Sequence, residues 1–223
     1  DVTAAVSELR NKLHDILRDA GIDISLKVTE VDVLLSEPKT RHEFLKYASE
    51  ITLDPTTANR KLFLSEGNRK VTFMEQQQSY PDHPIRFTDY NQALSRESLT
   101  ERCYWEVERR GCVDVAVSYK NITRPLASDE CRFGFSEKSW LLCCDTEKYT
   151  FCHNNIKTPV SGPVSSRIGV YLDHRAGILS FYSVSETMTL LHRVQTSFTQ
   201  PLYAGIRLRP SLFGSFAEFV NLK

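Results

Sequence analysis

The residues best equipped for chemistry fall in two short stretches of the chain. Asp173, His174 and Ser180 have the residue types of a hydrolytic triad, and the adjacent Cys152 and His153 have those of a thiol nucleophile and its base. Neighbours on a strand point to opposite faces, so this Cys–His pair is badly placed to act together. Asp173 and His174 fall in a predicted surface turn, where solvated polar residues are ordinary. Because the sequence also lacks a nucleophile elbow, a phosphate-binding loop and a zinc-protease helix, we predict that this chain is not an enzyme.

Six cysteines suggest two other kinds of chemistry, disulfide formation and metal binding. Their even number would permit disulfides, but several lie in apolar strand patterns, where a free cysteine behaves as a small hydrophobic residue. The sequence has no C-x-x-C pair, and Asp173 with His174 would give a metal only two adjacent ligands. We predict reduced thiols, no metal, no cofactor and a cytoplasmic location. The cysteines are Cys103, Cys112, Cys131, Cys143, Cys144 and Cys152.

The stretch 168–184 predicts a β-hairpin. Ile168, Val170 and Leu172 alternate with other residues before a polar turn that ends at Gly177, and a second apolar run follows. Gly177 supplies the positive φ that a short connection usually needs. This hairpin sets the character of the C-terminal three quarters of the chain.

Short β-type runs separated by turn residues recur from Ile51 onward, and no convincing helix interrupts them. This pattern predicts a mainly β fold, an antiparallel β-sandwich. Trp105 and Trp140 lie inside strand patterns and are assigned to the core. The predicted strands are 61–65, 70–74, 103–108, 113–119, 140–145, 149–153, 168–172, 178–184, 190–194, 202–208 and 216–221.

The first fifty residues have a different character. Residues 1–20 carry apolar side chains at heptad spacing, which predicts a helix that dimerises as the end of a coiled coil. A short amphipathic helix that packs on its own domain explains the same spacing equally well. We expect residues 22–38 to form an extended connector and residues 39–50 one short helix. The predicted dimerisation residues are Val2, Val6, Leu9, Leu13 and Ile16.

The charge of the chain is balanced, with 28 basic and 28 acidic residues. A dedicated nucleic-acid binder is usually basic, so we expect nucleic acid to be an improbable partner without excluding it. Neither end has an apolar run near the roughly 20 residues that span a bilayer, and no secretion signal is present. We therefore predict no membrane partner.

Three short motifs occur in a characteristic order. They are Leu53-Asp54-Pro55, then Trp105-Glu106-Val107-Glu108, then L-D-x-x-x-G-x-L-S-F-Y over 172–182. Together they resemble the PRY-SPRY (B30.2-type) domain, with PRY at about 51–95 and SPRY at about 96–223. Residues 1–50 resemble the coiled-coil end and linker of tripartite-motif (TRIM) proteins, especially the expanded group in fish.

The resemblance implies a bent, concanavalin-like sandwich of two antiparallel sheets, preceded by an α-helical segment. It also implies a protein-protein interaction module that recognises a target for a TRIM-type E3 ubiquitin ligase in innate immunity. The zinc-binding RING and B-box of such a parent would lie upstream. Similar domains end some NOD-like receptors and the stonefish pore-forming toxins, which are alternative parents.

Asp114 is the first candidate for ligand binding. If Val113, Val115 and Val117 fill the core, Asp114 projects from the other face of its sheet. Such a carboxylate is either solvated or meets a ligand, and the resemblance places the ligand pocket along this strand. We expect Asp114→Ala to weaken target binding and to leave thermal melting nearly unchanged.

Other candidate ligand-binding residues surround that strand in the predicted fold. Some relatives carry exposed aromatic residues where Cys143 and Asp145 stand here. Tyr149 begins an aromatic row on the next strand, although such rows are more often core. Two loops, 76–84 and 207–214, supply residues with the reach of interface anchors. These are Tyr80, His83, Arg209 and Phe213.

Two other functions remain open for a sandwich of this kind. A glycan-binding domain would need paired acidic and Asn ligands for calcium, or an exposed aromatic platform. RNA binding would show as an affinity that falls steeply with salt.

Overall fold

The computed structural model describes residues 37–122, 129–210 and 214–222. The chain divides into two compact units, Asp1–Lys39 and Thr40–Lys223, and the second unit contains every element discussed below. The predicted dimerisation residues, most of the expected connector and Phe213 lie outside the described residues.

The second unit begins with a short helical segment, as expected for residues 39–50. Thr40 caps the helix α3 (Arg41–Phe44), because its side-chain oxygen accepts a hydrogen bond from the Glu43 backbone N–H at 3.3 Å. A 3-10 turn, η1 (Leu45–Tyr47), follows directly.

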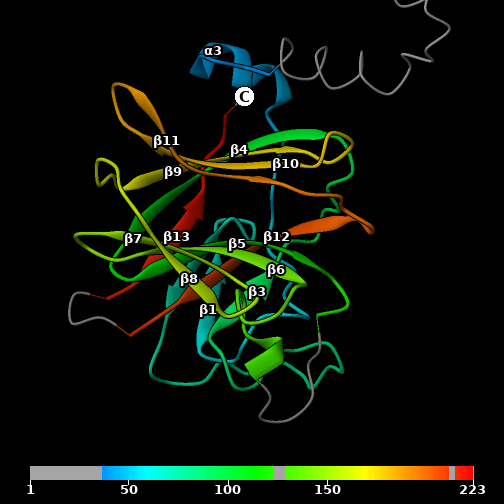
Figure 1. Ribbon diagram of the computed structural model, residues 1–223. Coiled ribbons are helices and arrows are strands. Elements are labelled where there is room, and N and C mark those ends of the chain that lie inside the picture. Colours follow the sequence, from blue (N-terminus) through cyan, green and yellow to red (C-terminus); the bar gives the residue numbers. More distant parts are fainter. Residues whose placement is uncertain (1–36, 123–128, 211–213, 223) are drawn as a thin grey trace, which may run out of the picture. The chain divides into compact units, whose positions relative to one another are not determined.

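Two antiparallel sheets make up the rest of the unit, and they confirm the predicted sandwich (Figure 1). The seven-stranded sheet has the order β1-β2-β13-β4-β9-β10-β11, and the six-stranded sheet has the order β3-β12-β5-β6-β7-β8. The strands of the first sheet are β1 (Leu62–Ser65), β2 (Lys70–Phe73), β13 (Phe216–Phe219), β4 (Arg102–Arg110), β9 (Arg167–Asp173), β10 (Ile178–Val184) and β11 (Met188–Gln195). Those of the second are β3 (Gln92–Leu94), β12 (Leu202–Leu208), β5 (Val113–Tyr119), β6 (Ser139–Cys144), β7 (Tyr149–His153) and β8 (Ile156–Val160).

The predicted hairpin is formed by β9 and β10, which pair antiparallel along their whole length. Asp173 closes the turn by accepting a hydrogen bond from the Ala176 backbone N–H at 2.9 Å. Gly177 has φ 72°, and a Cβ there would collide with the carbonyl oxygen of Thr196. Glycine is therefore required at this position for conformation and for space.

The main core lies between the two sheets and draws residues from both. Trp105 from the seven-stranded sheet and Trp140 from the six-stranded sheet are both buried in it, which confirms their assignment. All six cysteines are free, and four of them are buried.

Two strands were missed by the sequence pattern, β3 and β8. β3 has only three residues, which is too short for alternation to be recognised. β8 is exposed along nearly its whole length and contains Pro159, a residue that argues against a strand interior. As the last strand of its sheet it tolerates both features. At the opposite edge, β3 is covered by residues 53–59, whose backbone N–H groups reach Leu94 and Gln92.

The helix α3 covers part of the outer face of the seven-stranded sheet (Figure 1). Phe44 is 1% exposed and packs against Tyr104, Tyr171 and Tyr182 at ring-centroid distances of 5.2, 5.1 and 5.0 Å. Arg41 makes a bidentate ion pair with the buried Glu106, at 2.7 and 3.2 Å. Phe44 and Arg41 therefore fix α3 to the sheet, and the Ser49 backbone N–H, which donates to the Tyr104 carbonyl at 2.9 Å, fixes the end of the segment.

His192 gives the core a pH-sensitive point. Its ring stacks on Phe151 at 3.9 Å, and burial lowers its pKa from 6.5. The unfolded chain keeps the ordinary value, so it takes up the proton first as the pH falls through 6.5, and stability is lost. We expect the urea midpoint to decrease between pH 7.5 and pH 5.5. The urea midpoint of the His192→Phe variant should decrease less over the same pH range. Equal decreases for the variant and the wild type would contradict this assignment.

Candidate functional site

The outer face of the six-stranded sheet carries a row of side chains that begins at Gln92 of β3 and crosses all six strands. Val113, Val115 and Val117 do fill the core, so Asp114 faces outward as predicted. The strand register then places outward-facing residues side by side across the sheet. In spatial order the row is Gln92, Arg207, Asp114, Cys143, Thr150 and Pro159.

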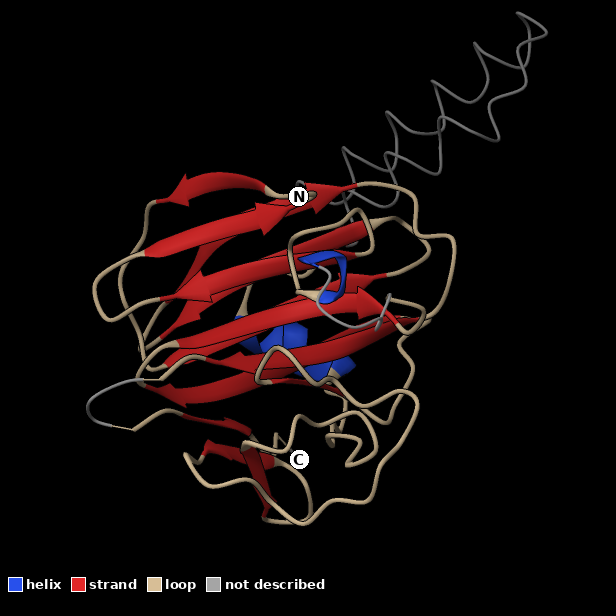
Figure 2. Cartoon of the chain, turned by 90° about the horizontal axis from the view of Figure 1, so that it is seen from below, coloured by secondary structure: helices blue, strands red, loops and turns tan. Residues whose placement is uncertain are grey.

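The neighbouring row on this face is covered by the segment around η2 (Asp129–Cys131), which lies in front of the sheet in Figure 2. Phe133 packs onto Gly205, where a Cβ would come within 2.9 Å of its ring. Gln92 holds the segment in place by donating to the Cys131 carbonyl at 2.6 Å and accepting from the Phe133 N–H at 3.3 Å. The row that contains Asp114 stays only partly covered, because Cys143 and Thr150 are half-buried.

Two arginines and two aspartates form an ion-pair network at the centre of this row. Arg207 contacts one carboxylate oxygen of Asp114 at 2.6 and 2.7 Å, and Arg209 contacts the other at 3.1 Å. Arg209 also contacts Asp145 at 2.6 Å. We call Asp114, Cys143, Asp145, Arg207 and Arg209 the Asp114 cluster.

The prediction that Asp114 is either solvated or free to meet a ligand is wrong. Its side chain is 0% exposed, because Arg207 and Arg209 cover it. Asp114 is therefore the floor of the cluster, whereas Arg209 and Asp145 are about one third exposed and form its rim. Sequence reasoning missed Arg207, although its spacing of two residues from Arg209 places both side chains on one strand face.

The electrostatics of the cluster favour binding over catalysis. Burial alone would lower the pKa of Arg209, but the charges of Asp114 and Asp145 raise it above its ordinary range. Burial, assisted by the charge of Asp114, raises the pKa of the Cys143 thiol to about 12. The nucleophilic form of a cysteine is the thiolate, so Cys143 is a poor nucleophile at neutral pH.

Two predicted site residues, Tyr149 and Tyr80, are held in structural contacts outside the cluster. Tyr149 is 2% exposed and packs in the core, so it is removed from the candidate surface. Tyr80 is not an exposed anchor either, because its hydroxyl donates to the Leu62 carbonyl at 2.9 Å and accepts from the Leu64 N–H at 3.3 Å. Tyr80 thus ties its loop to β1.

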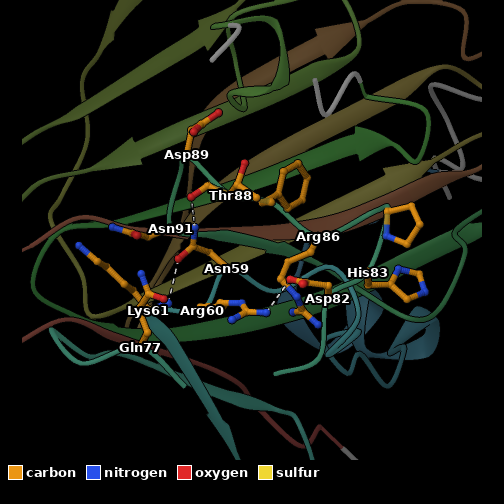
Figure 3. A pocket seen from close by; sticks show the side chains of 12 residues that line it. Asn59, Arg60, Lys61, Gln77, Asp82, His83, Arg86, Thr88, Asp89 and Asn91 are labelled. Atoms are coloured by element: carbon orange, nitrogen blue, oxygen red, sulfur yellow. Dashed lines mark hydrogen bonds and ion pairs between the residues drawn. The ribbon is translucent and has the colours of Figure 1, made fainter. Parts of the chain in front are cut away.

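His83 is exposed and lines a pocket of about 610 Å³ made by the loops around β1 and β3 (Figure 3). The pocket is distinct from the Asp114 cluster, and we call it the loop pocket. It is lined by Asn59, Arg60, Lys61, Gln77, Asp82, His83, Pro84, Arg86, Phe87, Thr88, Asp89 and Asn91.

Asp173 and His174, which have residue types found in catalytic triads, are occupied in structural contacts. Asp173 is buried and pairs with Arg102 at 2.6 Å, so its predicted place in a solvated turn is wrong. A ring nitrogen of His174 contacts the Gln200 carbonyl at 2.8 Å. Within residues 37–122, 129–210 and 214–222, no group of three or more His, Cys, Asp or Glu side chains is arranged to hold a metal. In the same part of the chain, no helix has the length and apolar character to cross a bilayer.

Two family models match most of the part of the chain that forms the sandwich. The family model of the PRY (SPRY-associated) domain matches residues 51–99, and that of the SPRY domain matches residues 102–217. Tripartite motif-containing protein 16 of Mus musculus is 36% identical over 89% of this chain and 37% of its own length. Stonustoxin subunit beta of Synanceia horrida is 41% identical over 82% of the chain and 26% of its own length. The chain thus spans only about a quarter to two fifths of the curated relatives that it matches.

Two solved structures from the same kinds of protein share this fold. The stonustoxin structure matches 83% of this chain and 31% of its own with a TM-score of 0.77 at 33% identity. The crystal structure of the TRIM65 PSpry domain matches 83% of this chain and 98% of its own with a TM-score of 0.74 at 26% identity.

Proposed function

Because the chain belongs to the SPRY family, with a PRY domain in front of the SPRY domain, we propose that it is a recognition module that binds a protein target at the Asp114 cluster. The observation that carries this proposal is the construction of the cluster. A fully buried carboxylate supports two arginines, and one of them remains about one third exposed beside a second carboxylate. Such a preformed, partly open polar surface has donors and acceptors fixed before a ligand arrives.

A protein target suits this surface better than a nucleic acid. The cluster holds two cationic and two anionic side chains, so it offers no net positive charge to a phosphate backbone. Cys143 of the cluster and the neighbouring Thr150 are half-buried and add small side chains to this surface. A surface with both charge signs and small neighbours can accommodate a peptide that presents its own donors and acceptors.

The wider role is also part of the proposal, since the chain covers only part of its relatives. We propose a cytoplasmic TRIM-type parent whose upstream RING would act as a ubiquitin ligase in innate immunity. Dimerisation through Val2, Val6, Leu9, Leu13 and Ile16 would let two weak sites act together by avidity. A sedimentation series that shows only monomer at high concentration would remove the dimer from this proposal.

Thr150→Arg tests the binding surface, because it adds bulk and charge to the row without removing a contact of the cluster. Peptides are first selected from a random display library against the full wild-type chain, and their affinities are measured by fluorescence anisotropy. We expect Thr150→Arg to weaken the selected peptides by about tenfold or more, the scale of one good interface contact.

Thr72→Arg is the matched control. Thr72 is also a half-buried strand threonine, but it lies on the outer face of the seven-stranded sheet. Its variant should bind the peptides like the wild type. Failure to select any peptide, or equal affinities of the two variants, would contradict binding at the Asp114 cluster.

A further inference from the structure

The loop pocket is not explained by the proposed surface. Its volume of about 610 Å³ lies in the range of ligand pockets, about 300–1,000 Å³. Residues 59–61 form one side of the pocket and residues 77–91 the other. Both loops lie within residues 51–99, which match the PRY domain. All lining residues except Pro84 and Phe87 carry polar or charged side chains, so the pocket can offer hydrogen-bond partners to a polar group among apolar side-chain stems.

Arg86 gives the pocket a buried positive charge. Its side chain donates hydrogen bonds to the backbone carbonyls of Pro55, Ala58 and Pro81, and the described residues provide no carboxylate that pairs with it directly. Burial lowers the pKa of Arg86, and the nearby charge of Arg60 lowers it further, although the charges of Asp82 and Asp54 offset part of this effect. A negatively charged ligand would relieve this repulsion between the two arginines.

Two further cations line the same space. Arg60 extends toward Arg86 and Asp82 in Figure 3 and pairs with Asp82 at 2.7 Å. Lys61 is exposed and has no ion-pair partner among the described residues. With Arg86, the pocket has three cationic side chains against the carboxylates of Asp82 and Asp89, an excess of one positive charge.

The pocket lies close to the Asp114 cluster. Asn91 lines it, and its carbonyl accepts a hydrogen bond from the Leu208 N–H at 2.9 Å. The next residue, Gln92, pairs with Arg207, which pairs in turn with Asp114 two strands away. Strands lie about 4.8 Å apart, so the β3 side of the pocket and Asp114 are separated by about 10 Å. An extended peptide advances about 3.3 Å per residue, so it needs at least three or four residues, and more because it must pass over the buried Gln92 and Arg207.

We propose that the loop pocket binds the carboxylate of an aspartate or glutamate side chain in the same peptide that occupies the Asp114 cluster. This inference rests on the proposed function. The single excess positive charge matches one carboxylate, and Lys61 provides its unpaired ammonium group. Asp82 and Asp89 at the same pocket would repel a polyanion, so a nucleic acid is disfavoured.

The test uses the peptides selected by the full chain. We expect them to contain an aspartate or glutamate, and replacing it with the matching amide should weaken binding to the wild type by about tenfold. Against Lys61→Glu, the amide peptide should bind at least as tightly as the acidic peptide, because the attractive charge is gone and the new carboxylate repels the acidic one. A peptide with lysine at that position should regain affinity for Lys61→Glu.

Lys46→Glu is the control. It makes the same charge change at an exposed lysine of η1, on the outer face of the seven-stranded sheet, and should leave all the peptides unaffected. Three results would overturn the carboxylate assignment. They are selected peptides without an acidic residue, a Lys61→Glu variant that still prefers the acidic peptide over the amide, and tighter binding of phosphoserine than of aspartate. Loss of binding in Thr150→Arg under those same outcomes would leave the proposed function standing.

Discussion

Asp114→Ala is expected to lower the free energy of unfolding by about 3–5 kcal/mol, the cost of breaking a buried ion pair from one side. The substitution leaves Arg207, which is 4% exposed, without a carboxylate in contact. Arg209 would still pair with Asp145, so the loss of stability should come mainly from the unpaired charge of Arg207. Urea unfolding followed by the fluorescence of the buried Trp105 and Trp140 measures the change. This geometry reverses the expectation from sequence that the variant would melt like the wild type.

Asp145→Ala is the control for that measurement. It removes a carboxylate of the same network, but its side chain is 29% exposed and solvent can replace the lost contact. Exposed pairs contribute about 0–1 kcal/mol, so the variant should stay within that range of the wild type. A loss below about 1 kcal/mol for Asp114→Ala would show that the buried charge of Arg207 is compensated in some other way.

Phe44→Ala is expected to cost about 3–5 kcal/mol, the usual range for truncating a buried aromatic side chain. The three tyrosine rings around Phe44 belong to β4 and to the β9–β10 hairpin, so they cannot close the gap without moving these strands. The loss should also loosen α3, because Phe44 is the buried side chain of this helix and the Arg41 ion pair is partly exposed. Limited proteolysis should therefore cut within residues 40–50 faster than in the wild type.

His42→Ala provides the comparison on the same helix. His42 is exposed, so its variant should unfold and resist proteolysis like the wild type. If Phe44→Ala were cleaved at the wild-type rate, the helix would have to be held by contacts other than this aromatic cluster.

Most of the fold was predictable because alternation records which side of a strand is buried. Strands β5, β7, β10 and β12 begin and end where the sequence pattern placed them. β3 and β8 were not recognised, since a three-residue strand and an exposed edge strand leave no apolar alternation to detect. The pattern reports burial, so it fails where a strand is stabilised by backbone pairing alone.

The candidate site was only partly predictable, for a different reason. Alternation assigned Asp114 to the outer face correctly, but its partner Arg207 is 93 residues away in sequence. Whether a carboxylate on a sheet face is solvated or paired depends on such non-local contacts, which a single sequence does not reveal. Tyr80 and Tyr149 were predicted to be available for ligand binding, but their hydroxyl groups are bonded to the backbone at Leu62 and Ser165. A single sequence does not reveal these partners either.

The two edges of the six-stranded sheet decide how a target can be recognised. Residues 53–59 already bond to the free side of β3, and Pro159 interrupts the row of donors on β8. Both edges therefore disfavour extension of this sheet by strand addition, a mode in which backbone hydrogen bonds supply much of the affinity. We therefore expect recognition to depend mainly on the target's side chains, so ligands with methylated backbone amides should still bind and scrambled sequences should not.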